Sequence, residues 1–293
     1  MMPSTAPISA ALNRLWLPRL SLTGCVRAVM SRSTLGLALT DAQRWNHFPA
    51  TPLCSITWWF AGHSEMLAAD APARLDSPRH APPARIVFAG PHNRPSASWN
   101  PGPVHGMMLM LLPDALHLLT GMNTTAWLNR MADVREVLPA PWVALCESVT
   151  TAPDDDTRMH MLQDFLDPQW QQTRPRLALN AQRYHDWAQG LALRAATSAS
   201  GRSLRQVERR IKQWAGQPMR ELMGIGRAER AFFEALAAEG EGRLDWADVA
   251  AEGGYADQSH LCRASRRVTG FAPEELRRRI AEDEGFWVYR VWE

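Results

Sequence analysis

The chain has 293 residues, which is enough for two domains of ordinary size. It is 46% hydrophobic and 21% charged, a globular composition that excludes a disordered or fibrous chain. The formal net charge of +2 is too small to indicate a class of partner, so charge has to be followed locally along the chain.

Cysteine usage and the N-terminal segment bear on the cellular compartment. The four cysteines, at positions 25, 54, 146 and 262, are scattered and form neither a CxxC motif nor a disulfide framework, which fits a reducing compartment. The first 22 residues lack the apolar core of a signal peptide, and no apolar run has membrane-spanning length. We therefore expect a soluble, cytoplasmic protein with no membrane partner.

Short apolar runs in the first third predict strands. After a loose lead-in over residues 1–20, the chain is rich in Pro, Gly and Ser, and apolar runs bounded by such turn residues are typical of short strands. Three prolines predict a loop at residues 74–83. We expect strands at residues 54–60, 85–90 and 106–112.

Helical patterns follow the last of these strands. Pro168 and Pro175 bracket a break, after which the chain is helical from Leu177 to about Ile280. The sequence therefore predicts an α+β N-terminal domain over residues 1–175 and an all-α domain over residues 176–293. Within the first domain, we expect helices at residues 114–120, 124–131, 141–149 and 159–166.

The N-terminal domain shows no pattern typical of catalysis or metal binding. GxSxG, P-loop and GxGxxG motifs are missing, and no pair of the nine histidines has ligand spacing with a carboxylate nearby. We therefore predict no enzyme, no cofactor and no metal. Trp58, Trp59 and Phe60 have two interpretations, the lining of an effector pocket or sheet core, and sheet core is favoured.

Residues 244–268 predict a helix, a tight turn and a second helix. Asp245 is suited to cap the first helix, Gly253-Gly254 to end it, and Asp257 to start the second. A helix that enters the major groove of DNA needs one apolar face and one polar face. In the second helix Leu261, Ala264, Ser265 and Val268 share the apolar face, and Gln258, Ser259, Cys262, Arg263 and Arg266 share the polar one.

A similar unit is predicted at about residues 187–214. A helix over residues 187–197 is followed by Ser200-Gly201, and Ser203 is a natural N-cap for the next helix. From residue 202 to residue 212 there are five basic residues and one acid, a local excess of +4 that suits contact with phosphates. In this helix we expect Leu204, Val207, Ile211 and Trp214 to be buried, and Arg205, Glu208, Arg209 and Lys212 to face outward.

A helical segment at residues 219–236 joins the two units. Eighteen residues make a helix about 27 Å long, at ~1.5 Å per residue. Such a linker suits two reading helices held about one DNA turn apart, roughly 34 Å.

The two units together resemble the AraC/XylS-type transcription regulators. The resemblance covers about residues 180–282 and lies in the run GYADQSHL from residue 254, TGFAP from residue 269, and SLRQVERR from residue 203. Two positions depart from the family: Ser265 replaces a usual large aromatic residue, and Gly253 replaces an apolar one. Because both positions face inward, we expect looser packing in the second unit.

The resemblance implies which residues bind DNA. The second helix of each unit would lie in successive major grooves. By their position about one turn beyond the middle of each helix, where it rises toward the DNA backbone, we expect Lys212 and Arg266 on phosphates. By position, the base-reading residues would be Arg205, Glu208 and Arg209 in the first unit, and Gln258, Ser259, Cys262 and Arg263 in the second.

The sequence thus predicts a sequence-specific DNA-binding transcription regulator whose partner is promoter DNA. The resemblance leaves open a small-molecule effector, a homodimer and contact with RNA polymerase. The alternative function is a DNA-binding module fused to a catalytic or repair-sensor domain, which needs a reactive cysteine with helper residues that the sequence does not show. A protein-interaction module is the second alternative, and the local charge of +4 argues against it.

The aromatic tail over residues 286–292 is the last predicted feature. Its apolar run predicts either a strand that packs back on the N-terminal domain or an interaction segment, and packing is favoured.

Overall fold

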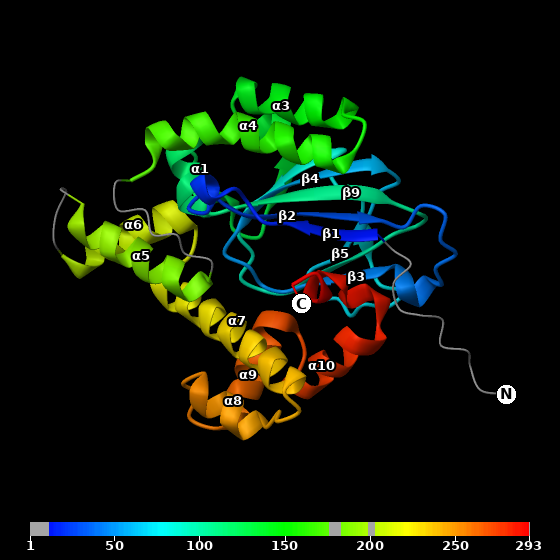
Figure 1. Cartoon of the computed structure of the whole chain (residues 1–293), viewed down its shortest axis with the longest axis vertical. Helices are drawn as coiled ribbons and strands as arrows, with labels where there is room; N and C mark the ends of the chain where they lie inside the picture. The colour runs from blue at the N-terminus through cyan, green and yellow to red at the C-terminus, as the bar shows by residue number, and fades with distance from the viewer. Residues whose placement is uncertain (1–11, 176–182, 199–202, 293) are drawn as a thin grey trace.

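The computed structural model describes residues 12–175, 183–198 and 203–292. A sheet region (residues 12–175) is followed by a helical region (residues 183–292), and Figure 1 shows the helices lying along one side of the sheets. This arrangement confirms the predicted α+β domain followed by two helix-turn-helix units and a linker helix. The expected boundary at 175/176 falls where the described residues stop.

The larger sheet has six strands, and every neighbouring pair is antiparallel. No residue of its three central strands is exposed, because helices cover one face and a second sheet lies over the other. In spatial order the strands are β1 (Leu12–Trp16), β2 (Val26–Ser33), β9 (His105–Leu111), β4 (Cys54–Ala61), β7 (Ile86–Ala89) and β10 (Met131–Asp133).

The smaller sheet has four antiparallel strands and closes over the inner face of the larger one. A cavity of about 150 Å³ lies between the two sheets, and Trp59 lines it. In spatial order the strands are β3 (Trp45–Phe48), β8 (Ser96–Trp99), β5 (Glu65–Leu67) and β6 (Arg79–His80).

Helices cover the outer face of the larger sheet (Figure 1). Trp58 is fully buried there, and its indole N–H donates to the carbonyl of Cys146 at 3.0 Å. The favoured interpretation of Trp58 as sheet core is therefore right, whereas Trp59 faces the cavity. The helices are α1 (Pro113–Thr120), α2 (Val134–Val137), α3 (Ala140–Thr151) and α4 (Asp155–Thr173), with short 3₁₀ turns η1 (Leu20–Leu22), η2 (Asp41–Arg44) and η3 (Thr124–Trp127).

Four predictions for this region need correction. The supposed lead-in contains strand β1, and the supposed loop at 74–83 contains the short strand β6. The helix expected over 124–131 is only the turn η3, because Asn129 takes a left-handed conformation before the chain enters β10. The predicted break at Pro168 lies inside α4, which continues because Leu166 and Trp170 on either side remain buried.

The helical region consists of the two predicted units, a linker and a C-terminal segment. The main hydrophobic core runs without interruption from the sheets into this region: it includes Leu109 of β9, Trp187 of α5 and Ile211 of α6. The elements are α5 (Tyr184–Thr197), α6 (Leu204–Ala215), α7 (Met219–Gly240), α8 (Trp246–Glu252), α9 (Gln258–Thr269), α10 (Pro273–Glu282), η4 (Glu284–Phe286) and α11 (Trp287–Arg290).

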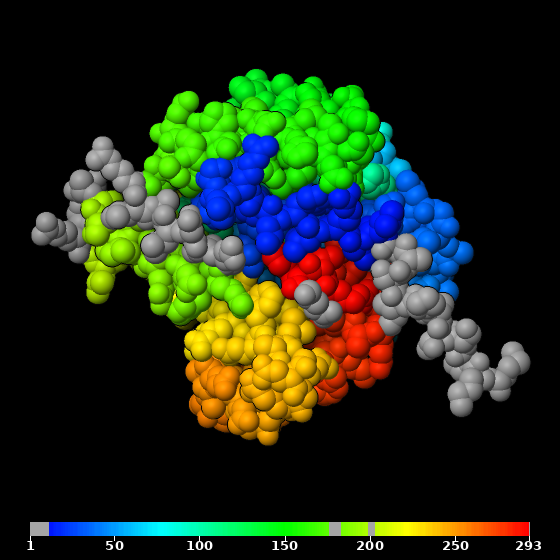
Figure 2. All heavy atoms as spheres, in the orientation of Figure 1, coloured from blue at the N-terminus to red at the C-terminus, as the bar shows by residue number. Residues whose placement is uncertain are grey.

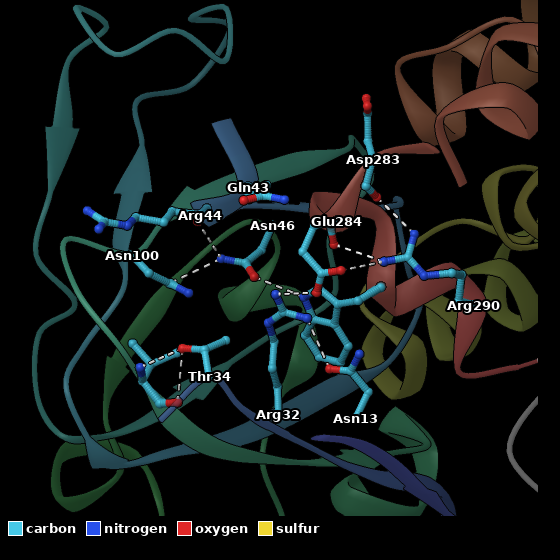
Figure 3. Close-up of polar contacts among 12 residues, drawn as sticks. Asn13, Arg32, Thr34, Gln43, Arg44, Asn46, Asn100, Asp283, Glu284 and Arg290 are labelled. Carbon is cyan, nitrogen blue, oxygen red and sulfur yellow. Dashed lines mark hydrogen bonds and ion pairs between the residues drawn. The ribbon is translucent and has the colours of Figure 1, made fainter. Parts of the chain in front are cut away.

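The aromatic tail is helical rather than a strand, and it packs on the sheet region. Figure 2 shows the last residues of the chain, in red, wedged between the N-terminal strands and the helices. The buried Arg32 and Glu284 form an ion pair at 2.8 Å, with side chains only 5% and 6% exposed. The indole of Trp287 donates to Asn46 at 2.9 Å, and the same cluster reaches Asn100 (Figure 3).

Candidate nucleic-acid interface

The first unit is formed by α5 and α6. Ser203 caps α6: its hydroxyl accepts from the N–H of Gln206, whose side chain in turn accepts from the N–H of Ser203. Gly216 ends the helix in the left-handed conformation. Arg210 donates to the carbonyl of Ala195 at 2.9 Å and holds α6 against α5. The expected turn at 200–201 and Arg202 lie outside the described residues.

Three of the four residues expected to face outward on α6 are exposed. They are Arg205, Arg209 and Lys212. Glu208 is different: it is half-buried, and its carboxylate accepts from the N–H of Met219 at 3.2 Å. This carboxylate satisfies one of the free N–H groups in the first turn of α7. In this structure Glu208 therefore fastens the linker helix to α6.

The predicted buried stripe of α6 is shorter than expected. Ile211 is buried, and Val207 and Trp214 are partly buried against the core. Leu204, expected in the same stripe, is 88% exposed. It is the first residue of the helix, beyond the edge of α5, so the correct helical spacing does not bring it to the core.

The second unit is formed by α8 and α9, and its helices begin where predicted. Asp245 accepts from the N–H of Ala247 at 2.7 Å, and Asp257 accepts from the N–H of His260 at 2.6 Å. Leu261, Ser265 and Val268 are buried, as the apolar face predicts. On the polar face Gln258, Ser259, Arg263 and Arg266 are exposed and Cys262 is partly exposed.

The two departures from the family have separate structural consequences. A Cβ on Gly253 would lie 2.9 Å from the carbonyl of Val249 and 3.0 Å from the ring of Tyr255, so the ring packs where a side chain would be. Ser265 is buried and donates to the carbonyl of Phe271 at 2.8 Å. A cavity of about 290 Å³ lies beside it. The looser packing expected in this unit is therefore found around Ser265.

The linker helix α7 has 22 residues and contacts helices of both units. Gly224 lies on it where Arg267 of α9 crosses: a Cβ there would meet the guanidinium at 2.4 Å. The same guanidinium pairs with Glu221 at 3.2 Å. This pair fastens α9 to α7, so Arg267 has a role inside the protein that the sequence pattern did not reveal.

The sheet region holds the C-terminal ends of both outward-facing helices. At α6, the hydroxyl of Thr125 donates to the carbonyl of Lys212 at 2.6 Å, and Thr124 donates to that of Gln213 at 3.0 Å. At α9, the backbone N–H of Ala50 donates to the carbonyl of Val268 at 2.7 Å. These carbonyls belong to the last helical turns, where helices need external donors.

A second contact between the regions is a buried ion pair beside α5. Arg27 of β2 pairs with Glu229 of α7 at 3.0 Å, and Glu229 also accepts from the N–H of Tyr184 at 2.7 Å. Burial raises the pKa of Glu229, and the guanidinium of Arg27 counteracts that rise. The linker helix is thus fixed to the sheet region by charge as well as by the shared core.

The thiols of the sheet region are not arranged for chemistry. Cys25 and Cys54 are fully buried, and burial raises the pKa of both thiols far above its ordinary value. Burial raises the pKa of Cys146 to about 12. Because the thiolate is the reactive form, these thiols are poor nucleophiles. Within the described residues, no group of three or more His, Cys, Asp or Glu side chains is placed to hold a metal.

Comparison with known families identifies the helical region. Residues 196–279 match a family described as "Helix-turn-helix domain". The helical region carries an AraC-type helix-turn-helix domain. The match covers α6, α7, α8, α9 and most of α10, so it includes the two outward-facing helices and their linker, and it supports a DNA-binding transcription regulator.

Solved structures show weaker likeness, and no curated protein matches the chain in sequence. The structure of ToxT from Vibrio cholerae O395 aligns over 91% of this chain and 96% of its own, at 10% identity and a TM-score of 0.36. The AraC-like transcriptional activator CuxR aligns over 89% of this chain and 78% of its own, at 12% identity and a TM-score of 0.23. Because these TM-scores lie below 0.5, the family assignment rests on the helix-turn-helix match. Among the described residues, no helix is long and apolar enough to cross a membrane.

Proposed function

We propose that the protein reads two successive major-groove segments of a promoter with α6 and α9. The observation that carries this proposal is the pair of exposed, arginine-bearing helix faces, each on the second helix of a unit. Both helices begin at a side-chain cap and leave their polar faces uncovered. A 22-residue linker is about 33 Å long at ~1.5 Å per residue, close to the roughly 34 Å of one DNA turn.

The exposed residues divide by their position along each helix. Arg209 and Arg263 lie near the middle, where a helix sits deepest in the groove, and arginine pairs bidentately with guanine. Lys212 and Arg266 lie one turn further on, where phosphates come within reach. The base-reading set is Arg205, Arg209, Gln258, Ser259, Cys262 and Arg263; Glu208 is left out because it holds α7.

A salt titration of DNA binding by the full-length protein tests this proposal. The two phosphate contacts of Lys212 and Arg266 should give a slope of log K against log salt of roughly −2 or steeper, at about −0.9 per phosphate contact. Lys212→Ala should weaken specific and scrambled DNA alike and make the slope shallower by about one unit. Arg263→Ala should cost about 1–3 kcal/mol on the specific site alone. A slope near zero, or equal losses on both DNAs for Arg263→Ala, contradicts the assignment.

The cavities of the sheet region support a small-molecule effector. A second cavity of about 150 Å³ lies at the border with the helical region, and Phe48 and Thr51 line both it and the cavity between the sheets. Ala50 and Val268, whose backbones are hydrogen-bonded, line the border cavity. An apolar ligand there would act directly on the contact that holds α9. DNA affinity measured with and without a candidate ligand tests this coupling.

A further inference from the structure

The AraC-type domain has a cavity of its own, apart from those of the sheet region. It measures about 290 Å³ and lies among α7, α8, α9 and α10. Two separate hydrophobic clusters meet there: one contains Leu261 and Val249, the other Leu276 and Ile280. Side chains of both clusters line the cavity, so the space divides what would otherwise be one core.

Short side chains create this space. Ser265 of α9 and Ala231 and Ala235 of α7 line it, and all three are buried. The serine hydroxyl donates to the carbonyl of Phe271, and the short side chain fills little of the cavity. Protein interiors are packed like organic crystals, and voids larger than a water molecule are few. An engineered cavity of about 150 Å³ is enough to bind benzene, so 290 Å³ accommodates a larger ring system.

One polar group in the wall has no partner. Tyr255 is 7% exposed, lines the cavity, and its hydroxyl makes no hydrogen bond. Buried polar groups are nearly always hydrogen-bonded, and each exception needs an explanation such as a ligand or water. A polar group of an occupant that reaches this hydroxyl would satisfy it.

The charged residues at the wall are already paired. Arg277 pairs with Glu239 at 2.8 Å and also with Glu274. Arg290 donates to the carbonyls of Ile280 and Asp283 and pairs with Glu284. The cavity therefore presents no unpaired charge to an occupant, which favours a neutral one.

We propose that this cavity binds a neutral aromatic molecule of about two rings, with one hydrogen-bonding group that meets the hydroxyl of Tyr255. Leu261 and Ser265, on the inner face of α9, form one wall. An occupant would therefore set the position of the helix that we propose to read DNA. Only this last coupling rests on the proposed function; binding itself does not.

Calorimetric titration of the full-length protein with 2-naphthol, without DNA, tests the proposal. We expect saturable binding and a higher melting temperature with the ligand. Ser265→Phe should fill the cavity and abolish one binding event. The substitution leaves no unsatisfied acceptor, because the carbonyl of Phe271 still accepts from the hydroxyl of Thr269 at 3.2 Å. Ala231→Leu fills the cavity from α7 and should also abolish this binding event. Tyr255→Phe should weaken binding by roughly twofold to tenfold, the worth of one hydrogen bond.

A matched control separates this cavity from the one between the sheets. Ser55 lines that other cavity, so Ser55→Phe should leave the binding event in the AraC-type domain intact. The proposal is overturned if the wild-type protein does not bind 2-naphthol, or if Ser55→Phe alone removes all binding. It is also overturned if both Ser265→Phe and Ala231→Leu bind as the wild type does. Failure of DNA binding leaves these outcomes unchanged, so the two proposals fail separately.

Discussion

His47 lies at the contact between the sheet region and the C-terminal segment. Its ring stacks on Phe286 with centroids 4.5 Å apart and meets the edge of Phe271. Burial, together with the charge of Arg279, lowers the pKa of His47 to about 4, although Asp283 opposes the change. The imidazole is therefore neutral in the folded protein near pH 7.

This depressed pKa predicts a loss of stability in mild acid. In the unfolded chain His47 has its ordinary pKa of 6.5. Below that pH the unfolded state therefore binds a proton that the folded state does not bind until about pH 4. The contribution is complete above pH 6.5 and is lost as the pH falls toward 4, by up to about 3 kcal/mol at ~1.4 kcal/mol per pKa unit. His47→Phe keeps the ring contact, and urea unfolding should show a flatter pH dependence for it. Equal pH dependence in both proteins would contradict the role given to His47.

Single side chains also show where sequence patterns stop being informative. The exposed face of α9 was predictable, because capping residues and an apolar repeat fix both the start and the rotation of a helix. Glu208 of α6 was predicted to face outward and Arg267 belongs to the basic end of α9, yet both side chains bind α7. Which charged residue bends back to a neighbouring helix depends on the packing angle between helices, and a single helix does not encode that angle.

Among the elements, the helices of the AraC-type domain were predicted best and short elements worst. The strands β4, β7 and β9 were predictable from apolar runs, but β1, at the sheet edge, has little apolar pattern of its own. The prediction of a strand for the tail was wrong for another reason: a continuous apolar run suits a buried strand or a buried helix equally well. Its helical form follows from the contacts of Glu284 and Trp287 with the sheet region, which lie far away in the sequence.

Two leucines that the sequence pattern places on the apolar faces of their helices give a matched test of the element assignments. Leu261→Asp places a charge in the buried face of α9 and should lower the free energy of unfolding by about 3 kcal/mol or more. Leu204→Asp lies at the exposed start of α6 and should change it by less than about 0.5 kcal/mol. Both variants are compared with the wild type by urea unfolding. Similar losses for the two would mean that the start of α6 is packed differently.

At the scale of the whole molecule, the sheet region shares one core with the first helix-turn-helix unit, and buried polar contacts join it to the rest of the helical region. The C-terminal ends of α6 and α9 accept hydrogen bonds from the sheet region. On the far side, the chain ends by inserting Glu284 and Trp287 beside Arg32 and Asn46. A change in the sheet region would therefore act directly on α6 and α9, the helices that we propose to read DNA.

Removing one partner of the ion pair between Arg32 and Glu284 should destabilise the protein more than removing both. Glu284→Gln leaves a buried guanidinium without its counter-charge and should cost about 3–5 kcal/mol. The double variant Arg32→Met with Glu284→Met removes both charges and should recover most of that loss, since paired burial of charge brings little net stability. Arg290, which also pairs with Glu284, keeps the carbonyls of Ile280 and Asp283 as acceptors in both variants. Thermal melting of the three proteins checks this. A double variant as unstable as Glu284→Gln would contradict this expectation, because it would show that the ion pair itself contributes net stability.

The central claim, that α6 and α9 read successive grooves, is tested most directly by a hydroxyl-radical footprint. The full-length protein is bound to a site selected from random DNA. We expect two protected stretches on one face of the duplex, about 10 base pairs apart centre to centre. Leu261→Asp should erase one stretch and leave the other. A single short protected stretch for the wild type, or two stretches that vanish together in every variant of either unit, would contradict the account.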